Sequence, residues 1–341
     1  MTDTRGENGR VTILDIARAT GVSKSSVSRF LDERARPSNS ETAQLVRRVA
    51  AELGYVRDVS AANLRRGSTG MIGVIVPRLT DTVMAMLYEA LARAAGRHQR
   101  FTIVATTDDD PAANQRTVDM LLARGVDGLV LATARIGDGF AERLAAQGVR
   151  FVLALRTDEI HPSSVGDDRL GGFLATRHLI DLGHRRIGLI AGPQDASNAV
   201  GRVEGYHQAM AEAGLEPRPE WIVPSTFGLE GGHRAARQLI ALSERPTAIF
   251  AVNDNTAIGA VSALTQAGLS VPADVSVVGY NDIPIVSHLP TPLTTVRIPF
   301  DQVAARALDL LIDGRGDDAD PISRAAPTLI PRKSTARPHG G

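Results

Sequence analysis

From Met71 onward, short apolar runs alternate with amphipathic segments of helical length, and this alternation limits the fold more than any other feature of the chain. Such alternation is typical of repeated βαβ units around a parallel sheet. It comes in two sets, so we expect two similar sheets. The expected strands are 72–76, 102–106, 128–131 and 151–155 in the first set, 187–191, 221–224, 248–252 and 276–279 in the second, and 295–298 last; the expected helices are 82–97, 112–124, 138–147, 169–183, 199–213, 230–243, 255–267 and 301–313.

Polar and aromatic side chains follow many of these expected strands. In an open parallel sheet, ligands bind beyond the carboxyl ends of the strands, and two sheets placed face to face form a cleft there. We therefore expect a ligand cleft lined by the residues that come directly after the strands. The candidates are residues 78–81, residues 107–110, Arg156, Phe227, Asn253, Asp254, Asn281 and Asp282.

Ahead of this region, the stretch from Val11 to Asp32 has the pattern of two short helices joined by a glycine turn. The first is expected at 13–19, Gly21 supplies the turn, and Ser23 can cap the second. The second helix would turn donor side chains outward, and lysine and arginine suit the acceptor edge of guanine in a major groove. The pattern predicts a helix-turn-helix, although similar helix pairs occur in folds that never contact DNA. The outward residues are Lys24, Ser25, Ser28 and Arg29.

A third helix is expected from a cap at Asn39 to about Leu53, with Gly54 ending it. The three helices would share one small core, to which the third contributes Leu45, Val46, Val49, Ala50 and Leu53. A polar stretch at 55–70 follows, with a possible short helix around Ala-Ala-Asn-Leu-Arg-Arg and a Gly-Ser-Thr-Gly linker.

Charge is divided unevenly along the chain. Residues 1–66 hold 12 Lys and Arg against 8 Asp and Glu, a charge of +4, and the remainder carries −4 because the total is zero. A basic amino-terminal part on an acidic body suits a DNA-facing end. The chain has no cysteine, which excludes disulfides, cysteine-based zinc sites and a thiol nucleophile. No apolar run is long enough to cross a bilayer, and the polar amino terminus does not look like a signal peptide, so we expect a cytoplasmic protein.

A series of motifs in order resembles the LacI (lactose repressor) family of bacterial transcription regulators, from Val11 to about Thr335. The motifs are DIARATGVSKSSVSR, AELGY, DGLVLA, HLIDLGHRRIGLIAGP, GRVEGY, PTAIFAVNDNTAIGA, VPADVSVVGYND, PLTTV and LIPRKST. The resemblance implies an all-α helix-turn-helix headpiece and an α/β body of two doubly wound parallel-sheet subdomains, like the type I periplasmic binding proteins. The implied boundaries are 1–56 for the headpiece, 57–70 for a hinge helix and linker, 71–335 for the body and 336–341 for a tail, with one subdomain at about 71–165 plus 298–325 and the other at about 166–297 plus 326–335.

The same resemblance implies roles for residues in the first 66 positions. Lys24, Ser25 and Arg29 would read bases, whereas Ser23, Ser28 and Thr42 would contact phosphates or orient toward them. Leu64 matches the hinge leucine that the family inserts into the minor groove, and Ala61 lies on the same expected helix. An apolar wedge of this kind unstacks a base step and kinks the duplex. The alternative for Leu64 is an ordinary buried leucine.

In the cleft, the family pattern implies five effector-binding residues: Arg202, Phe227, Asn253, Asn281 and Phe300. Guanidinium and amide groups fix hydroxyls or carboxylates, and an aromatic face covers an apolar sugar face. Two positions depart from many relatives, because Asn281 and Leu155 stand where those carry aspartate. With fewer carboxylates, and with three arginines (Arg78, Arg156 and Arg202) near strand ends, we expect a neutral or anionic ligand over a simple polyol.

Taken together, these features predict a sequence-specific DNA-binding regulator, a repressor, that binds a palindromic operator as a homodimer. A small-molecule effector, a sugar or a sugar derivative, would control it, and it would associate with the nucleoid when bound to DNA. The alternative is an enzyme on a doubly wound fold, which needs a nucleophile–base pair or a metal site. We find neither and predict no catalytic residue, metal, cofactor or membrane partner. Residues 108–110 and 167–168, although acidic, are interpreted as helix starts.

Overall fold

The computed structural model describes residues 11–31, 38–55, 68–314 and 321–338. The chain divides into two compact units, Met1–Thr69 and Gly70–Gly341, which are the headpiece and the body. Within these described ranges, no helix is long and apolar enough to cross a membrane.

Three helices form the headpiece: α1 (Ile13–Thr20), α2 (Lys24–Phe30) and α3 (Glu41–Glu52). The first begins with a capping box between Thr12 and Asp15, and it ends where Gly21 adopts a φ of 68°. A left-handed residue of this kind is cheap only for glycine, so Gly21 defines the turn before α2. The helices share a core in which Ile16, Val27, Val46 and Ala50 are buried.

The third helix differs from the expectation at both ends. Its cap is Ser40 rather than Asn39, because the Ser40 Oγ accepts the Ala43 amide at 3.3 Å. Leu53, expected in the core, is 42% exposed just after the last turn. Helical periodicity predicts which face is apolar but does not fix where the final turn leaves the core.

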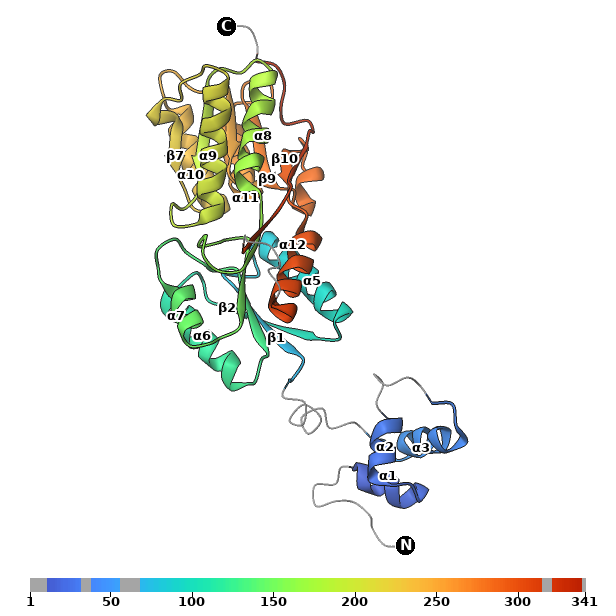
Figure 1. Cartoon of the computed structure of the whole chain (residues 1–341). Coiled ribbons are helices and arrows are strands. Elements are labelled where there is room, and N and C mark those ends of the chain that lie inside the picture. The colour runs from blue at the N-terminus through green and yellow to red at the C-terminus, as the bar shows by residue number, and fades with distance from the viewer. Residues whose placement is uncertain (1–10, 32–37, 56–67, 315–320, 339–341) are drawn as a thin grey trace. The chain divides into compact units, whose positions relative to one another are not determined.

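Figure 1 shows α5 and α12 on one side of the body's first sheet, and α6 and α7 on the other. Successive strand residues serve these opposite sides: Val74 and Val76 lie in the cluster with α5 and α12, whereas Ile75 lies in the cluster with α6 and α7. All pairings in this sheet are parallel. The strand order is β11-β5-β4-β3-β1-β2, from β1 (Met71–Val76), β2 (Phe101–Thr106), β3 (Gly128–Leu131), β4 (Phe151–Ala154), β5 (Ser163–Gly166) and β11 (Ile322–Ala325); the helices are α5 (Thr82–Arg97), α6 (Pro111–Ala123), α7 (Phe140–Ala146) and α12 (Phe300–Asp313).

The second sheet has the same build, with one antiparallel strand at its edge. Helices pack in pairs, α8 on α9 and α10 on α11. The first pair is so close that a Cβ on Gly205 would lie 2.1 Å from the Arg169 carbonyl oxygen. The strand order is β12-β10-β9-β8-β6-β7, from β6 (Ile187–Ala191), β7 (Ile222–Pro224), β8 (Ala248–Ala251), β9 (Ser276–Asn281), β10 (Thr294–Arg297) and β12 (Thr328–Ile330); the helices are α8 (Asp168–Asp181), α9 (Ser197–Glu212), α10 (Leu229–Ile240) and α11 (Asp254–Gln266), with short 3₁₀ turns at Pro219–Trp221 and Pro284–Ser287.

The predicted alternation of strands and helices is present, but the sequence pattern missed β5, β11 and β12. In β5, Ser163 and Ser164 are almost fully buried, and their hydroxyls donate to backbone carbonyls at 2.7 and 2.8 Å. A polar strand can lie inside a sheet when its hydroxyls are paired in this way. Trp221, expected to begin a strand, ends a 3₁₀ turn, where its indole N–H donates to the Glu244 carbonyl at 3.1 Å.

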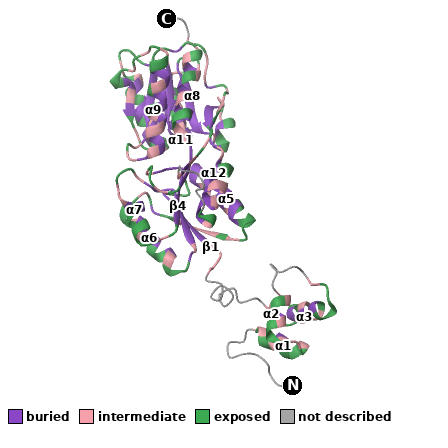
Figure 2. Cartoon of the chain, in the orientation of Figure 1, coloured by how far each residue is buried: buried purple, intermediate pink, exposed green. Residues whose placement is uncertain are grey.

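The chain passes between the two sheets at 167, at 298–299 and at 326–327, so each sheet is built from separate parts of the sequence. Figure 2 shows the inner strands of both sheets largely buried, with exposure on the outer sides of the helices, whereas the edge strands β2, β7, β11 and β12 are partly exposed. Because three segments join the sheets, the two subdomains can change their relative tilt without losing either core.

Candidate functional sites

The α2 helix presents donor side chains to solvent. Ser23 caps it, because the Ser23 Oγ accepts a backbone N–H of the first turn at 3.3 Å. Lys24, Ser25 and Arg29 are exposed, and the fully buried Val27 fixes the opposite side of the helix to the headpiece core. Ammonium, guanidinium and hydroxyl donors on an exposed helix suit contacts to base edges and phosphates.

The remaining DNA-site candidates lie in three places. Ser28 is half-buried on α2, and Thr42 is exposed in the first turn of α3. Ala61 and Leu64 lie outside the described residues, so their predicted hinge role stays a prediction.

One pocket lies between the two subdomains, where the strands end. It encloses about 40 Å³, whereas ligand pockets usually hold about 300–1,000 Å³. A small molecule therefore enters only when the subdomains separate or the lining side chains move. The fifth predicted effector residue, Phe300, packs in the hydrophobic core instead of lining the pocket. The lining residues are Pro77, Arg78, Asp81, Val83, Met84, Asp109, Leu155, Arg156, Asn198, Arg202, Phe227, Asn253 and Asn281.

Arg202, on α9, has a side chain only 5% exposed and largely occupied by protein contacts. Its Nε donates to Asp168 Oδ1 at 2.8 Å, and its Nη1 donates to the Val252 carbonyl at 2.6 Å. The guanidinium also lies 3.7 Å from the centre of the Tyr280 ring. Burial raises the pKa of Asp168, an effect that the positive charge of Arg202 opposes. Only the remaining guanidinium N–H groups can meet a ligand.

Arg156, two residues after β4, is held in a similar way. Both of its Nη atoms donate to the carboxylate of Asp109 at 3.2 Å, and its guanidinium lies 5.7 Å from the centre of the Phe227 ring. Arg156 belongs to the first subdomain and Phe227 to the second, so this contact crosses the pocket. Because Arg156 and Arg202 each face a carboxylate, the pocket is not the strongly cationic site that three arginines alone would make.

Two asparagines at strand ends serve the pocket differently. Asn253 caps α11: its Oδ1 accepts the Thr256 amide at 2.8 Å, and its Nδ2 donates to the Phe227 carbonyl at 2.9 Å. Asn281 ends β9 with a φ of 104°, and only 4% of it is exposed. Asn253 therefore positions the aromatic residue, while Asn281 lines the pocket.

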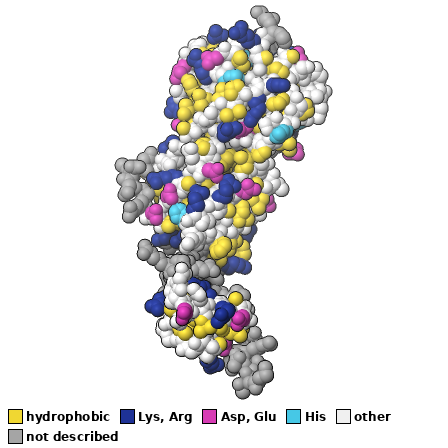
Figure 3. Space-filling view, turned by 90° about the vertical axis from the view of Figure 1, so that its right-hand side faces the viewer, with side chains coloured by type: hydrophobic (Ala, Val, Ile, Leu, Met, Phe, Trp, Pro, Cys, Tyr) yellow, Lys and Arg dark blue, Asp and Glu magenta, His cyan; other side chains and the backbone are white. Residues whose placement is uncertain are grey.

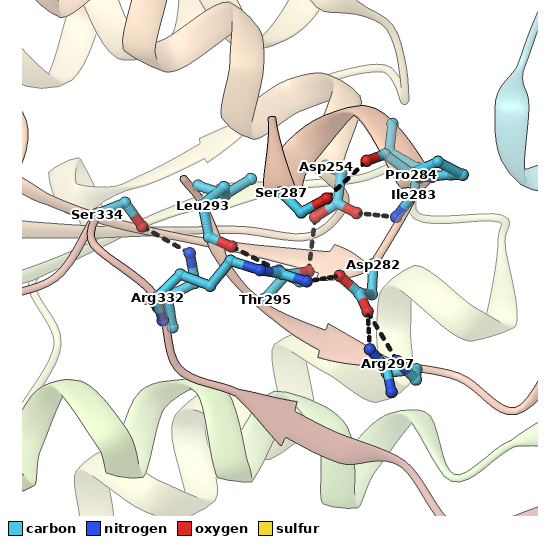
Figure 4. A network of polar contacts seen from close by, with 11 residues as sticks. Asp254, Asp282, Ile283, Pro284, Ser287, Leu293, Thr295, Arg297, Arg332 and Ser334 are labelled. Atoms are coloured by element: carbon cyan, nitrogen blue, oxygen red, sulfur yellow. Dashed lines mark hydrogen bonds and ion pairs between the residues drawn. The ribbon is translucent and has the colours of Figure 1, made fainter. Parts of the chain in front are cut away.

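Two further carboxylates, those of Asp254 and Asp282, lie in a network of polar contacts next to Asn253 and Asn281 (Figure 4). The carboxyl group of Asp254, 1% exposed, accepts the Thr295 hydroxyl at 2.6 Å and the Ile283 amide at 2.8 Å. Burial raises its pKa to about 7. Asp282, by contrast, has cationic partners, receiving Arg297 Nε at 2.7 Å and Arg332 Nη2 at 2.6 Å. Asp254 and Asp282 are thus structural, although both lie within three residues of a strand end.

Asp81, after β1, faces the pocket from the first subdomain. It caps α5 by accepting the Val83 amide at 3.1 Å, and it accepts Asn255 Nδ2 from the second subdomain at 3.3 Å. Burial raises its pKa, whereas the hydrogen bond from Val83 and the charge of the exposed Arg78 act in the opposite direction.

Backbone strain gathers at the same strand ends. Among the described residues, seven that are not glycine have a positive φ, and five of them lie at the end of β2, β4 or β9 or just after it. Leu155, at 62°, has the bulkiest side chain of the five. Strained backbone persists where surrounding contacts enforce it, and it clusters at ligand sites. The five residues are Asp108, Asp109, Leu155, Asn281 and Asp282.

Leu155 also borders a second, larger cavity of about 480 Å³ between the subdomains. This cavity lies beside the amino-terminal ends of α8 and α9 and holds Thr157, Asp167, Ser197 and Glu204 in its wall. Leu155 therefore stands between a small pocket and a cavity of ligand size.

A three-helix unit with a basic exposed helix, joined to a two-sheet body with a cleft, defines the class: a DNA-binding regulator that carries a ligand-binding body. Comparison with known families agrees. Residues 12–58 match the model for bacterial regulatory proteins of the lacI family, and residues 176–335 match that for a periplasmic binding protein-like domain.

Individual relatives match over nearly their whole length. The ribose operon repressor of Haemophilus influenzae is 35% identical over 88% of this chain and 91% of its own, and the HTH-type transcriptional repressor PurR of Pasteurella multocida is 32% identical over 95% and 98%. A crystal structure of the lac repressor dimer bound to operator and the anti-inducer ONPF has a TM-score of 0.85 at 28% identity, covering 96% of this chain and 99% of that one. A cellobiose complex of the regulator CelR has a TM-score of 0.73 at 28% identity, covering 95% and 100%.

The chain therefore belongs to the LacI family of bacterial regulatory proteins. It is a DNA-binding transcriptional regulator and not an enzyme. The predicted fold class is confirmed as well: helix-turn-helix headpiece and two parallel-sheet subdomains.

Sequence reasoning missed three residues at the cleft. Asn198 lines the small pocket from α9 and is 8% exposed. Arg135 and Asp195 form an ion pair of 2.7 Å that joins the subdomains. Both follow strands, Arg135 after β3 and Asp195 after β6, but each is four residues beyond the strand. Both therefore lie beyond the first residues after each strand, where ligand-binding side chains are expected.

Proposed function

We propose that this regulator is a repressor that binds a palindromic operator as a dimer and is controlled by a small molecule in the cleft. The observation that carries the proposal is the set of exposed donors on α2 in a chain whose body closes around a pocket. The proposed parts are a headpiece at 1–56, a hinge at 57–70, a body at 71–335 with the two subdomains as predicted, and a tail at 336–341. It acts in the cytoplasm, on DNA of the nucleoid.

DNA reading is assigned to α2. Lys24, Ser25 and Arg29 contact bases, and Ser23, Ser28 and Thr42 contact phosphates or orient toward them. Ala61 and Leu64 form the hinge that enters the minor groove. Effector binding changes the relative tilt of the subdomains and so orders or melts the hinge helices. This is allostery only if the effector binds the two states unequally, usually by about 1–3 kcal/mol.

The proposed effector is a neutral sugar or sugar derivative. Arg156 and Arg202 already face carboxylates, which removes the excess positive charge that an anion would need. Amide groups of Asn198 and Asn281 and the ring of Phe227 suit hydroxyls and an apolar sugar face. Related structures were solved with cellobiose and with ribose. Calorimetric titration tests this choice: neutral sugars bind and sugar phosphates do not, and the reverse order would contradict it.

Self-association is assigned to the edge of the first sheet. Phe101 begins the edge strand β2 and is 73% exposed, and an edge strand presents unpaired backbone groups that a second chain can cover. Hydrophobic side chains also gather between charged ones on the face of the body seen in Figure 3. Phe101→Glu should shift the protein from dimer to monomer in analytical ultracentrifugation, whereas Ile160→Glu, at another exposed apolar residue, should leave it dimeric.

The deciding experiment is binding of the purified protein to a palindromic promoter fragment. Tight, salt-sensitive binding that is lost on deleting residues 1–66 is expected, because phosphate contacts release counterions. Lys24→Ala and Arg29→Ala should each cost about 1–3 kcal/mol on the preferred site and relax base preference. Arg18→Ala, at an exposed cation on α1, is the control and should leave base preference intact. Full preference in both α2 variants would refute the assignment.

A further inference from the structure

Two hydrogen bonds donated by backbone amides cross from the first subdomain to the second on the side of the larger cavity. The Ile136 amide donates to the Asp195 carbonyl at 2.8 Å. The Thr157 amide donates to the Ser197 hydroxyl, also at 2.8 Å. Both bonds break when the subdomains separate, so each amide reports closure of the cleft.

Arg135 adds a charged contact to the first of these bonds. Its Nη1 donates to Asp195 Oδ2 at 2.7 Å, with the two side chains 27% and 44% exposed. Asp195 is thereby held at two atoms, its carboxylate by Arg135 and its carbonyl by the next residue, Ile136. A charged hydrogen bond anchored beside a backbone bond loses less side-chain entropy than an isolated surface pair.

The same guanidinium also reaches the small pocket through Asp109. Arg135 Nη2 donates to the Asp109 carbonyl oxygen, and the Asp109 carboxylate holds Arg156. Arg156 in turn meets the Phe227 ring of the second subdomain. Asp109 has a φ of 61°, a backbone state that needs support from its surroundings. A continuous path of contacts thus runs from Asp195, through Arg135 and Asp109, to the side chains that line the pocket.

We propose that Arg135 is the latch of the cleft: its ion pair with Asp195 holds the subdomains closed, and its bond to Asp109 couples that closure to Arg156. Loss of the ion pair raises the population of the open body. Loss of Arg135 does this and also frees the Asp109 loop, so that Arg156 no longer keeps its position. The inference rests on the proposed function only in assigning the pocket to an effector, because the latch itself is a property of the body.

Hydrogen exchange of the full-length protein, resolved to single amides by mass spectrometry, tests the latch without DNA or effector. The amides of Ile136 and Thr157 report opening of the cleft, and the Asp110 amide, which donates to the Thr107 carbonyl at 2.8 Å, reports the Asp109 loop. Asp195→Asn keeps the carbonyl that Ile136 uses but removes the charge. Exchange at Ile136 and Thr157 should become about 5- to 10-fold faster, while Asp110 exchanges as before.

Arg135→Gln should accelerate all three amides. The matched control is Arg93→Gln, because Arg93 pairs with Asp301 at 2.9 Å within the first subdomain; it should leave all three rates unchanged. The amide of Phe250, inside β8, checks that each variant stays folded.

Faster exchange at Ile136 alone means a local loop movement and overturns the latch, as do unchanged rates in Asp195→Asn. An unchanged Asp110 rate in Arg135→Gln overturns the coupling to Arg156. Failure of the protein to bind DNA would contradict the proposed function but would not change the expected exchange rates, so the two failures are distinguishable.

Discussion

Asp254→Asn should stabilise the body at neutral pH, although it removes a carboxyl group next to Asn253, which lines the pocket. Asp254 is buried, with a hydroxyl and an amide as donors and no cation bonded to it among the described residues, in contrast to Asp282 (Figure 4). Burial raises its pKa from 3.8 to about 7. Asparagine can keep both contacts, since its oxygen accepts the Ile283 amide and the Thr295 hydroxyl can rotate to accept from its nitrogen.

The size of the effect follows from proton linkage. The folded protein holds this proton to a higher pH than the unfolded chain does, so stability falls as pH rises from 3.8 to about 7. A pKa difference of about 3, at about 1.36 kcal/mol each, amounts to roughly 4 kcal/mol once Asp254 is ionised. The advantage of Asp254→Asn over the native protein should therefore grow from near zero at pH 4 to as much as about 4 kcal/mol at pH 8.

Urea unfolding of the full-length protein at pH 4, 5, 6, 7 and 8 measures this difference. Trp221 is the single tryptophan and is 4% exposed, so its fluorescence reports unfolding of the body. Asp119→Asn, at an exposed carboxylate on α6, serves as control and should show no such trend. A difference that is equal at pH 5 and pH 8 would refute the reasoning, because it would mean that Asp254 is ionised in the folded protein across that range.

Three further predictions concern the second subdomain. Burial lowers the pKa of His184 below 6.5, so its contribution to stability is complete above that pH and is lost as pH falls; His184→Gln should flatten the pH dependence of unfolding between pH 7 and 5. Gly205→Ala should lower the free energy of unfolding, measured in urea, by about 3 kcal/mol or more, because the new Cβ would lie 2.1 Å from the Arg169 carbonyl oxygen. Gly96→Ala is the control: nothing lies near its Cβ, so it should raise the free energy of unfolding by about 0.5–1 kcal/mol. Arg202→Met should lower the free energy of unfolding by about 3–5 kcal/mol, because it leaves the buried Asp168 without its cationic partner. Adding Asp168→Asn should recover part of that loss. Equal stabilities of the single and double variants would contradict the pairing.

Which segments form helices and strands was largely determined by local sequence. Local signals act through neighbouring residues and therefore predict these elements from the sequence. Examples are the apolar runs at β3 and β6, the proline after Asp110 and the glycine at the end of α1. The order of the family motifs then identified the headpiece and the body. Where local signals were weak, as in the buried serines of β5, the strand was missed because its stability comes from partners distant in sequence.

The sequence also brought Arg156, Arg202 and Asn253 to strand ends, but only the tertiary structure decided what each contacts. Arg156 pairs with Asp109, 47 positions away, and Arg202 pairs with Asp168, 34 positions away. Asn253 caps a helix. Arg135 and Asp195 lie 60 positions apart in loops with no recurring pattern. Contacts of this kind depend on how two separately built sheets face each other, which periodicity along one chain does not encode.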